Sequence, residues 1–267
     1  MYGIFTLLKL MILPQPGTRL PTAAELPCSD DTPVDNELQN LAPNLLEEVL
    51  ARIWADRSDW FWAVDMGIYH DPQKPPFVPD GFLSLGVPRL KGDDLRLSYV
   101  FWEESYTIPT LFLEIVSQTY GGEYDQKLWD YEALGVPYYV IFNPLCLPKA
   151  GRIRRRYRQH QVLEVYCLSS EGYELQVGNP VWLPELNLGI GWERGSYRGR
   201  SLEWLYWYDQ NGERYLTTEE LVDQTQQEKE QERQRAEQER QRAEQERQRA
   251  DKLAAYLRSQ GIDPDQL

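Results

Sequence analysis

One stretch of the chain, residues 111 to 144, limits the possible folds more than any other. It opens with an apolar run, Leu-Phe-Leu-Glu-Ile-Val from 111 to 116, which is typical of a strand buried on both faces. Gly121-Gly122 ends that strand, and the spacing that follows predicts a helix over 123–134, closed by Gly135. The next strand is YYVIFN, so the stretch predicts a parallel strand–helix–strand unit with a right-handed crossover.

Glu114 is the unexpected residue in this unit, because it interrupts an otherwise apolar strand. Burying an unpaired carboxylate costs several kcal/mol, so the chain is expected to supply a metal, a cation or a shifted pKa. Lys127 lies on the inward stripe of the predicted helix, together with Tyr124, Leu128, Tyr131 and Leu134. Lys127 and Asp80, which lies within the predicted strand FVPDGFLSLGV, are therefore the candidate companions of Glu114.

The order of these residues resembles a known family. Pro79-Asp80, Glu114 within LEIVS, and GEYDQKLWDYEALGVPYYVIFNP are similar to the bacterial putative restriction endonuclease domain family, a branch of the PD-(D/E)XK nuclease superfamily. The resemblance covers about residues 36 to 205. It implies an α/β fold of the restriction-endonuclease type, a mixed β-sheet flanked by helices.

The resemblance also implies Mg²⁺-dependent cleavage of DNA, with Asp80 and Glu114 as metal ligands. The superfamily motif places its lysine two residues after the glutamate, where this chain has Val116. Lys127 is the replacement that the branch's own pattern suggests. Mg²⁺, or another divalent cation, held by two carboxylates can activate water and neutralise charge at a phosphodiester, and a lysine can orient the water or contact the phosphate.

Four further residues are weaker site candidates. Asp65 precedes Gly67 and either approaches the metal or belongs to a turn, and Asp125 either joins the site or places charge in the first turn of its helix. Arg154 and Arg156 belong to the basic run 152–158 of an otherwise acidic body. They either meet phosphates from one face of a strand or keep a solvated hairpin edge from pairing.

The rest of the body predicts a helix that begins at Pro43, strands around residues 60–70 and 77–87, and antiparallel strands leading to residue 111. Short strands follow from residue 152, including RIRRRYR and VLEVYCL. The aromatic run 201–208, SLEWLYWY, either covers the core or faces a partner. We divide the chain into a flexible, proline-rich arm (1–34), a restriction-endonuclease-like domain (35–215) and a charged helical tail (216–267).

The tail repeats QERQRAE with a period of seven, and alanine is the only apolar residue that recurs in register, at 236, 243 and 250. This pattern specifies no strong coiled coil, so the alternatives are a long solvated helix and a weak alanine-lined dimer seam, hence a possible homodimer.

Composition narrows the function further. The net charge of −14 argues against general coating of DNA, and the 3 cysteines show no metal-binding or disulfide spacing. No apolar run is long enough to cross a membrane, which leads us to expect a cytoplasmic protein without a membrane partner. Two functions remain: a Mg²⁺-dependent DNA endonuclease, or a catalytically inactive nuclease-fold protein that assembles through its C-terminal helix.

Overall fold

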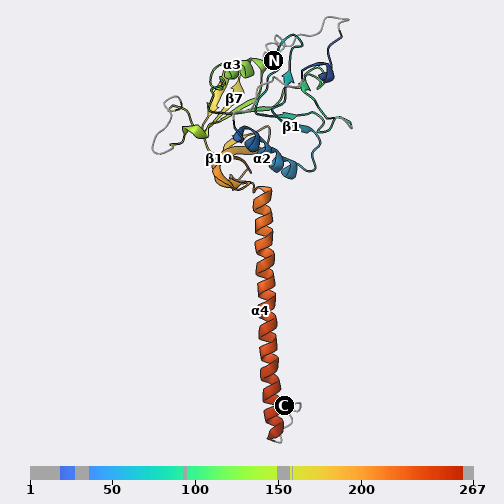
Figure 1. The fold of residues 1–267 in the computed structure, drawn as a ribbon, viewed down its shortest axis with the longest axis vertical. Helices are drawn as coiled ribbons and strands as arrows, with labels where there is room; N and C mark the ends of the chain where they lie inside the picture. The colour runs from blue at the N-terminus through green and yellow to red at the C-terminus, as the bar shows by residue number, and fades with distance from the viewer. Residues whose placement is uncertain (1–18, 28–35, 93–94, 149–156, 158, 261–267) are drawn as a thin grey trace. The chain divides into compact units, whose positions relative to one another are not determined.

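The computed structural model describes residues 19–27, 36–92, 95–148, 157 and 159–260, and it divides the chain into two compact units, 1–215 and 216–267. Both are visible in Figure 1. The helices of the described residues are η1 (Ala23–Glu25), α2 (Leu38–Ile53), α3 (Gln126–Leu134), η2 (Pro144–Cys146) and α4 (Thr218–Ser259). None of these helices has the length and apolarity needed to cross a membrane.

The core of the first unit is a mixed sheet. Within the described residues its strand order is β1-β3-β5-β6-β7-β8, in which β5 and β6 run parallel and every other neighbouring pair runs antiparallel. The strands are β1 (Trp60–Val64), β3 (Gly81–Leu85), β5 (Leu111–Ile115), β6 (Tyr138–Phe142), β7 (Leu163–Ser169) and β8 (Gly172–Gln176). The predicted fold class and the parallel unit β5-α3-β6 are thereby confirmed.

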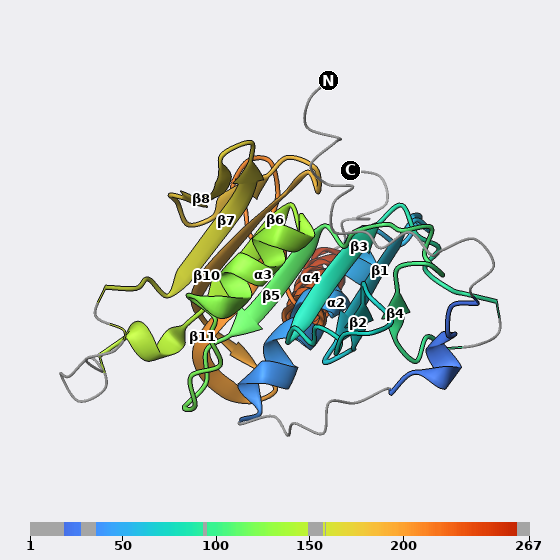
Figure 2. The same ribbon diagram turned by 90° about the horizontal axis from the view of Figure 1, so that it is seen from above.

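The two faces of this sheet are covered differently (Figure 2). On one face, α3 packs its buried Tyr131 against Phe112 of β5 and Tyr139 of β6, with ring centroids 4.7 and 5.1 Å apart. On the other face α2 approaches β3 so closely that a β-carbon added to Gly81 would lie 3.1 Å from Cβ of Pro43. Each helix thus fixes the position of one side of the central strands.

The α2 helix starts five residues before the predicted Pro43. Leu41 and Ala42 are buried together with Pro43, and the side chain of Asn36 accepts a hydrogen bond from the Leu38 N–H at 2.8 Å, which starts the helix earlier. Pro43 is tolerated inside the helix at the loss of one backbone hydrogen bond. Similarly, α3 begins at Gln126 and not at Glu123, because Asp125 caps it.

A second sheet lies beyond α2 and was not foreseen as a sheet. It is antiparallel in the order β11-β10-β9, and its strands are β9 (Val181–Leu183), β10 (Leu188–Tyr197) and β11 (Arg200–Tyr208). The indole of Trp207 donates to the carbonyl of Leu46 at 3.0 Å and contacts Trp62 edge-on. Of the two roles considered for the aromatic run 201–208, the core role is confirmed for residues 204–208, which are all buried.

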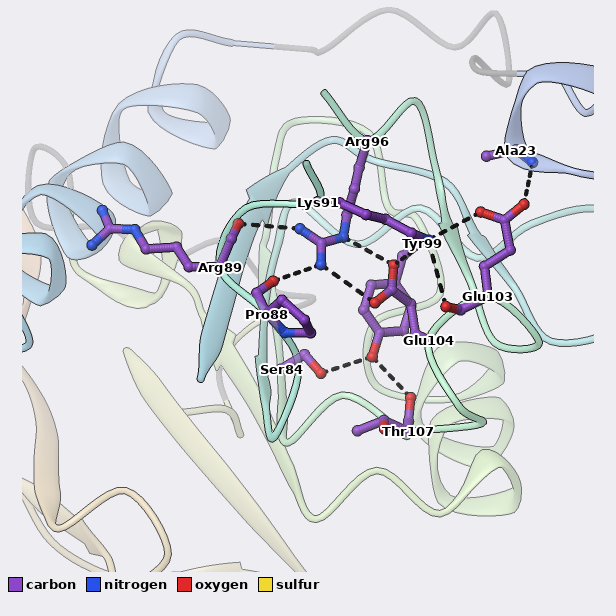
Figure 3. Close-up of polar contacts among 10 residues, drawn as sticks. All are labelled: Ala23, Ser84, Pro88, Arg89, Lys91, Arg96, Tyr99, Glu103, Glu104 and Thr107. Atoms are coloured by element: carbon purple, nitrogen blue, oxygen red, sulfur yellow. Dashed lines mark hydrogen bonds and ion pairs between the residues drawn. The ribbon is translucent and has the colours of Figure 1, made fainter. Parts of the chain in front are cut away.

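The segment between β3 and β5 differs from the expected antiparallel strands. β2 (Ile68–Tyr69) and β4 (Tyr99–Val100) form a small parallel pair, and after β4 the chain turns from 101 to 106 and does not continue as a strand. Figure 3 shows what stabilises the turn: Arg96 Nε lies 2.9 Å from Glu104 Oε1, and both side chains are 3% exposed. Lys91 joins Glu104 to Glu103, at 3.1 Å from each carboxylate.

The described part of the N-terminal arm, residues 19–27, is attached to this turn. The backbone N–H of Ala23 donates to Glu103 Oε1 at 2.9 Å, and the indole of Trp102 donates to the carbonyl of Pro21 at 2.7 Å. The hydroxyl of Tyr69 reaches the carbonyl of Pro27 at 2.8 Å. These nine residues are therefore bound to the body; the rest of the arm lies outside the described residues.

Candidate functional site

Asp80 and Glu114 face each other across neighbouring strands. The antiparallel register of β3 and β5 pairs Gly81 with Leu113, and continuing it by one residue sets Asp80 opposite Glu114. Residues directly opposite in an antiparallel pair have β-carbons about 4.5–5.5 Å apart and point to the same face of the sheet. The two carboxylates therefore converge where β3 begins and β5 nears its end.

Glu114 is 2% exposed and has a partner on each oxygen. Lys127 Nζ lies 2.7 Å from Oε2, and the hydroxyl of Tyr131 donates to Oε1 at 2.6 Å. Both partners come from α3, one helical turn apart, so a single helix determines the orientation of the carboxylate. The predicted proximity of Lys127 and Glu114 is confirmed, while the catalytic roles of both residues stay predictions.

Asp80 is held by α2 and by the backbone of β5. Gln39 Nε2 donates to Oδ1 at 3.1 Å, and the N–H of Ile115 donates to Oδ2 at 2.6 Å. Burial, followed by the negative charge of Glu114, raises the pKa of Asp80 to about 8, although the Ile115 hydrogen bond and the charge of Lys127 act in the opposite direction. The pair therefore resists carrying two negative charges at once.

Lys127 stays positively charged in this environment. Burial on its own would lower the pKa of Lys127, but the charge of Glu114 and the hydrogen bond to it outweigh burial, and the net shift is upward. Its side chain is 30% exposed, whereas that of Glu114 is 2% exposed. Lys127 thus connects the buried carboxylate to the solvent-facing side of the site.

Glu123 is a third buried acid beside the pair. Both of its oxygens accept the N–H of Gly121, at 3.2 and 3.1 Å, and the residue is 4% exposed. Burial raises the pKa of Glu123, and the charge of Glu114 adds to the shift, against the lowering by backbone hydrogen bonds and Lys127. Three buried carboxyl groups, Asp80, Glu114 and Glu123, therefore act on the charge of Lys127.

The weaker candidates have other positions. Asp65 is exposed at a positive φ of 50° directly after β1, which fits the turn alternative, although its charge contributes to the raised pKa of Asp80. Asp125 is exposed and caps α3, accepting the N–H of Gln126 at 2.6 Å, which fits the helix-start alternative. Arg154 and Arg156 lie outside the described residues.

Two carboxylates form a donor set that suits a small, hard divalent cation. Mg²⁺ binds through one or two carboxylates and retains several waters. Among the described residues, no cluster of three or more His, Cys, Asp and Glu side chains is placed to hold a metal, so a cation here would rely on Asp80, Glu114 and water. The mutual repulsion of Asp80 and Glu114 is the feature that a cation would relieve.

Gln39 was not predicted to belong to the site, and Tyr131 was predicted only as part of the inward stripe of its helix. Tyr131 lies on the same inward stripe as Lys127, so its reach toward Glu114 was accessible from the helical period. Gln39 is 41 residues from Asp80, and no local pattern connects the two. Only the packing of α2 against β3 brings them together.

The chain matches a known protein family. The family model Uma2, described as "Putative restriction endonuclease", matches residues 31–198, which include every residue of the site described above. No curated protein gives a significant match to the chain.

Proposed function

Because the chain belongs to the Uma2 family, we propose that it is a divalent-metal-dependent endonuclease that hydrolyses phosphodiester bonds in DNA. The observation that carries this proposal is the opposed pair Asp80 and Glu114, with Lys127 bonded to Glu114 at 2.7 Å. Two carboxylates and a lysine at the end of a buried strand pair form a set that suits metal-assisted hydrolysis of a phosphodiester.

Asp80 and Glu114 would hold the cation, which is Mg²⁺ by the chemistry of these donors. When bound, it supplies charge neutralisation at the phosphate and lowers the pKa of a coordinated water. Gln39 and the Ile115 N–H orient Asp80, and Tyr131 orients Glu114. These three contacts hold the two carboxylates in place.

Lys127 has a separate role in the proposal. Its ammonium group is positively charged, partly exposed and attached to Glu114, so it can donate hydrogen bonds to the phosphate or to the attacking water. Lysine acts at this position as a fixed positive charge, since its pKa is raised. Lys127 comes from α3 and lies 11 residues after Val116, the position at which the superfamily motif has its lysine. In the proposal, Lys127 performs the task of that motif lysine from a different position in the chain.

The test is nicking of supercoiled plasmid DNA by the full chain, with Mg²⁺ and with a chelator. We expect activity that requires the metal and that falls by at least ~100-fold in Asp80→Asn and in Glu114→Gln, the range found when a metal-site or charge-stabilising group is removed. Asp125→Asn is the matched control, because this exposed carboxylate lies on the same helix as Lys127 and caps it. Nicking that persists in both site variants would rule out the proposal.

A further inference from the structure

The long helix α4 carries two kinds of glutamate, which differ in their contacts. One glutamate of each repeat accepts a hydrogen bond from the glutamine four residues later, as in Gln241 to Glu237 at 3.1 Å; Gln234 to Glu230 and Gln248 to Glu244 repeat it. The other glutamate of each repeat makes no hydrogen bond or ion pair within the described residues; this set is Glu232, Glu239 and Glu246. Only the first kind therefore makes hydrogen bonds within the helix.

The second kind of glutamate forms a row with an arginine row beside it. Glu239 lies three residues after Ala236 and four before Ala243, while Arg240 lies four after the first alanine and three before the second. Residues three and four apart are neighbours on a helix surface, so the two rows flank the alanines on opposite sides. The glutamate row is Glu232, Glu239 and Glu246, and the arginine row is Arg233, Arg240 and Arg247.

The strip between the rows is narrow and ends in larger apolar residues. Val222 and Leu257 occupy the same heptad position as the alanines, and Lys229 is the polar residue in that register. Val222 is 48% exposed, and no residue of α4 is buried among those that the structure describes. Alanine allows two helices to approach closely, and the charged residues beside the alanines then determine which partner helix can bind.

We propose that α4 binds the α4 helix of a second copy of this chain, in parallel and in register, along this strip. In a parallel two-fold pair, the glutamate row of each copy lies beside the arginine row of the other. In an antiparallel pair, glutamate would lie beside glutamate and arginine beside arginine, which is repulsive. A nucleic acid is a poor occupant, because the glutamate row would face its phosphates.

Parallel pairing has a consequence for the site. The first unit precedes α4 in the chain, so parallel pairing brings the two copies of Thr217, where the helix begins, to the same end of the paired helices. Two copies of the Asp80 and Glu114 site would then be connected to that one end. This self-association stands independently of the proposed nuclease activity.

Sedimentation of two charge-reversed full-length chains tests the pairing. Glu239→Arg with Glu246→Arg gives a chain with arginine on both sides, and Arg240→Glu with Arg247→Glu gives one with glutamate on both sides. We expect a dimer for the parent chain, monomers for each variant alone, and a dimer for their equimolar mixture. Gln238→Arg with Gln245→Arg is the control, because these positions lie on the opposite face of the helix, and it should stay dimeric.

A monomeric parent chain, or a mixture that stays monomeric, would overturn the proposal. Orientation is tested by oxidative cross-linking of Ala236→Cys and Ala250→Cys, with the parent chain as background for its own cysteines. Parallel pairing predicts covalent dimers for each variant alone. Dimers that form only in the mixture of the two variants would show antiparallel pairing and refute the arrangement proposed here.

Discussion

The hydroxyl of Tyr131 donates a hydrogen bond to Glu114 Oε1 at 2.6 Å, from the helical turn that follows Lys127. Tyr131 is 1% exposed, and its ring is enclosed by Phe77, Phe112 and Tyr139. The ring therefore fixes the position of the hydroxyl, and the hydroxyl fixes one oxygen of the carboxylate. Two neighbouring turns of α3 thereby orient both oxygens of Glu114.

Tyr131→Phe should distinguish the contribution of the hydroxyl from that of the ring. The ring contacts remain, but one oxygen of a buried carboxylate loses its donor, which we expect to cost about 1–3 kcal/mol of unfolding free energy. Metal-dependent nicking should fall as well, because Glu114 becomes free to rotate. Denaturant unfolding with the nicking assay measures both effects, and Tyr173→Phe, which loses a hydroxyl bonded to the Val136 carbonyl, is a control that should retain activity.

Stability should depend on pH through Asp80. Its pKa rises from 3.8 to about 8 on folding, so the folded protein holds this proton more tightly than the unfolded chain between these values. The unfolding free energy then falls as pH rises through this window, by a few kcal/mol when complete. Asp80→Asn should flatten the dependence and make the metal-free protein more stable at the upper end of the window.

Mg²⁺ should oppose the fall in unfolding free energy that we expect as pH rises. A cation shared by Asp80 and Glu114 favours their ionised forms, so thermal stabilisation by Mg²⁺ should be small near pH 5 and larger near pH 8, because protons compete with the metal. Scanning calorimetry with Mg²⁺ or a chelator measures the shift in melting temperature. Equal stabilisation of the parent chain and Asp80→Asn would contradict the assignment of the metal to this carboxylate.

Lys127→Met should destabilise the fold and abolish nicking. It leaves Glu114 buried without its cation, and breaking such a pair costs about 3–5 kcal/mol, the lower end being expected here because Lys127 is 30% exposed. Lys127→Arg should recover most of the unfolding free energy but less of the activity, since a planar guanidinium does not replace an ammonium geometrically. If Lys127→Met retains nicking, the lysine serves the fold alone.

The sequence allowed the helix face of this site to be predicted, but not its other half. Lys127 and Tyr131 share an inward stripe with Leu134, so the helical period alone aims them at β5. Asp80 was accessible because it lies in the strand predicted around residues 77–87, whereas the position of its partner Gln39 depends on how α2 packs. Local patterns determine which face of an element is buried; they do not determine which distant element covers it.

The same limit applied to the rest of the fold. The β5-α3-β6 unit was predictable because glycines and the apolar period mark its borders within 34 residues. The sheet β9-β10-β11 was not predictable, because it packs on a distant segment of the chain: Trp207 donates its hydrogen bond to the carbonyl of Leu46, 161 residues away. The parallel pairing of β2 with β4 likewise joins distant segments of the chain, and the turn at 101–106 that follows it contains the buried ion pair of Glu104 with Arg96.

Glu104→Gln should reveal how much that turn depends on its ion pair. Figure 3 shows that Arg96 also donates hydrogen bonds to the carbonyls of Pro88 and Arg89. In the variant, Arg96 would keep these bonds and its place over the ring of Phe61 but would lose its carboxylate partner. Removing one partner of a buried pair costs about 3–5 kcal/mol, whereas Glu203→Gln, which breaks the surface pair with the 69% exposed Arg194, should cost less than about 1 kcal/mol. Chemical denaturation of both variants gives the comparison. Because Glu104 lies outside the candidate site, nicking per folded molecule should be unchanged, and equal costs for the two variants would show that the Arg96 pair does not stabilise the turn.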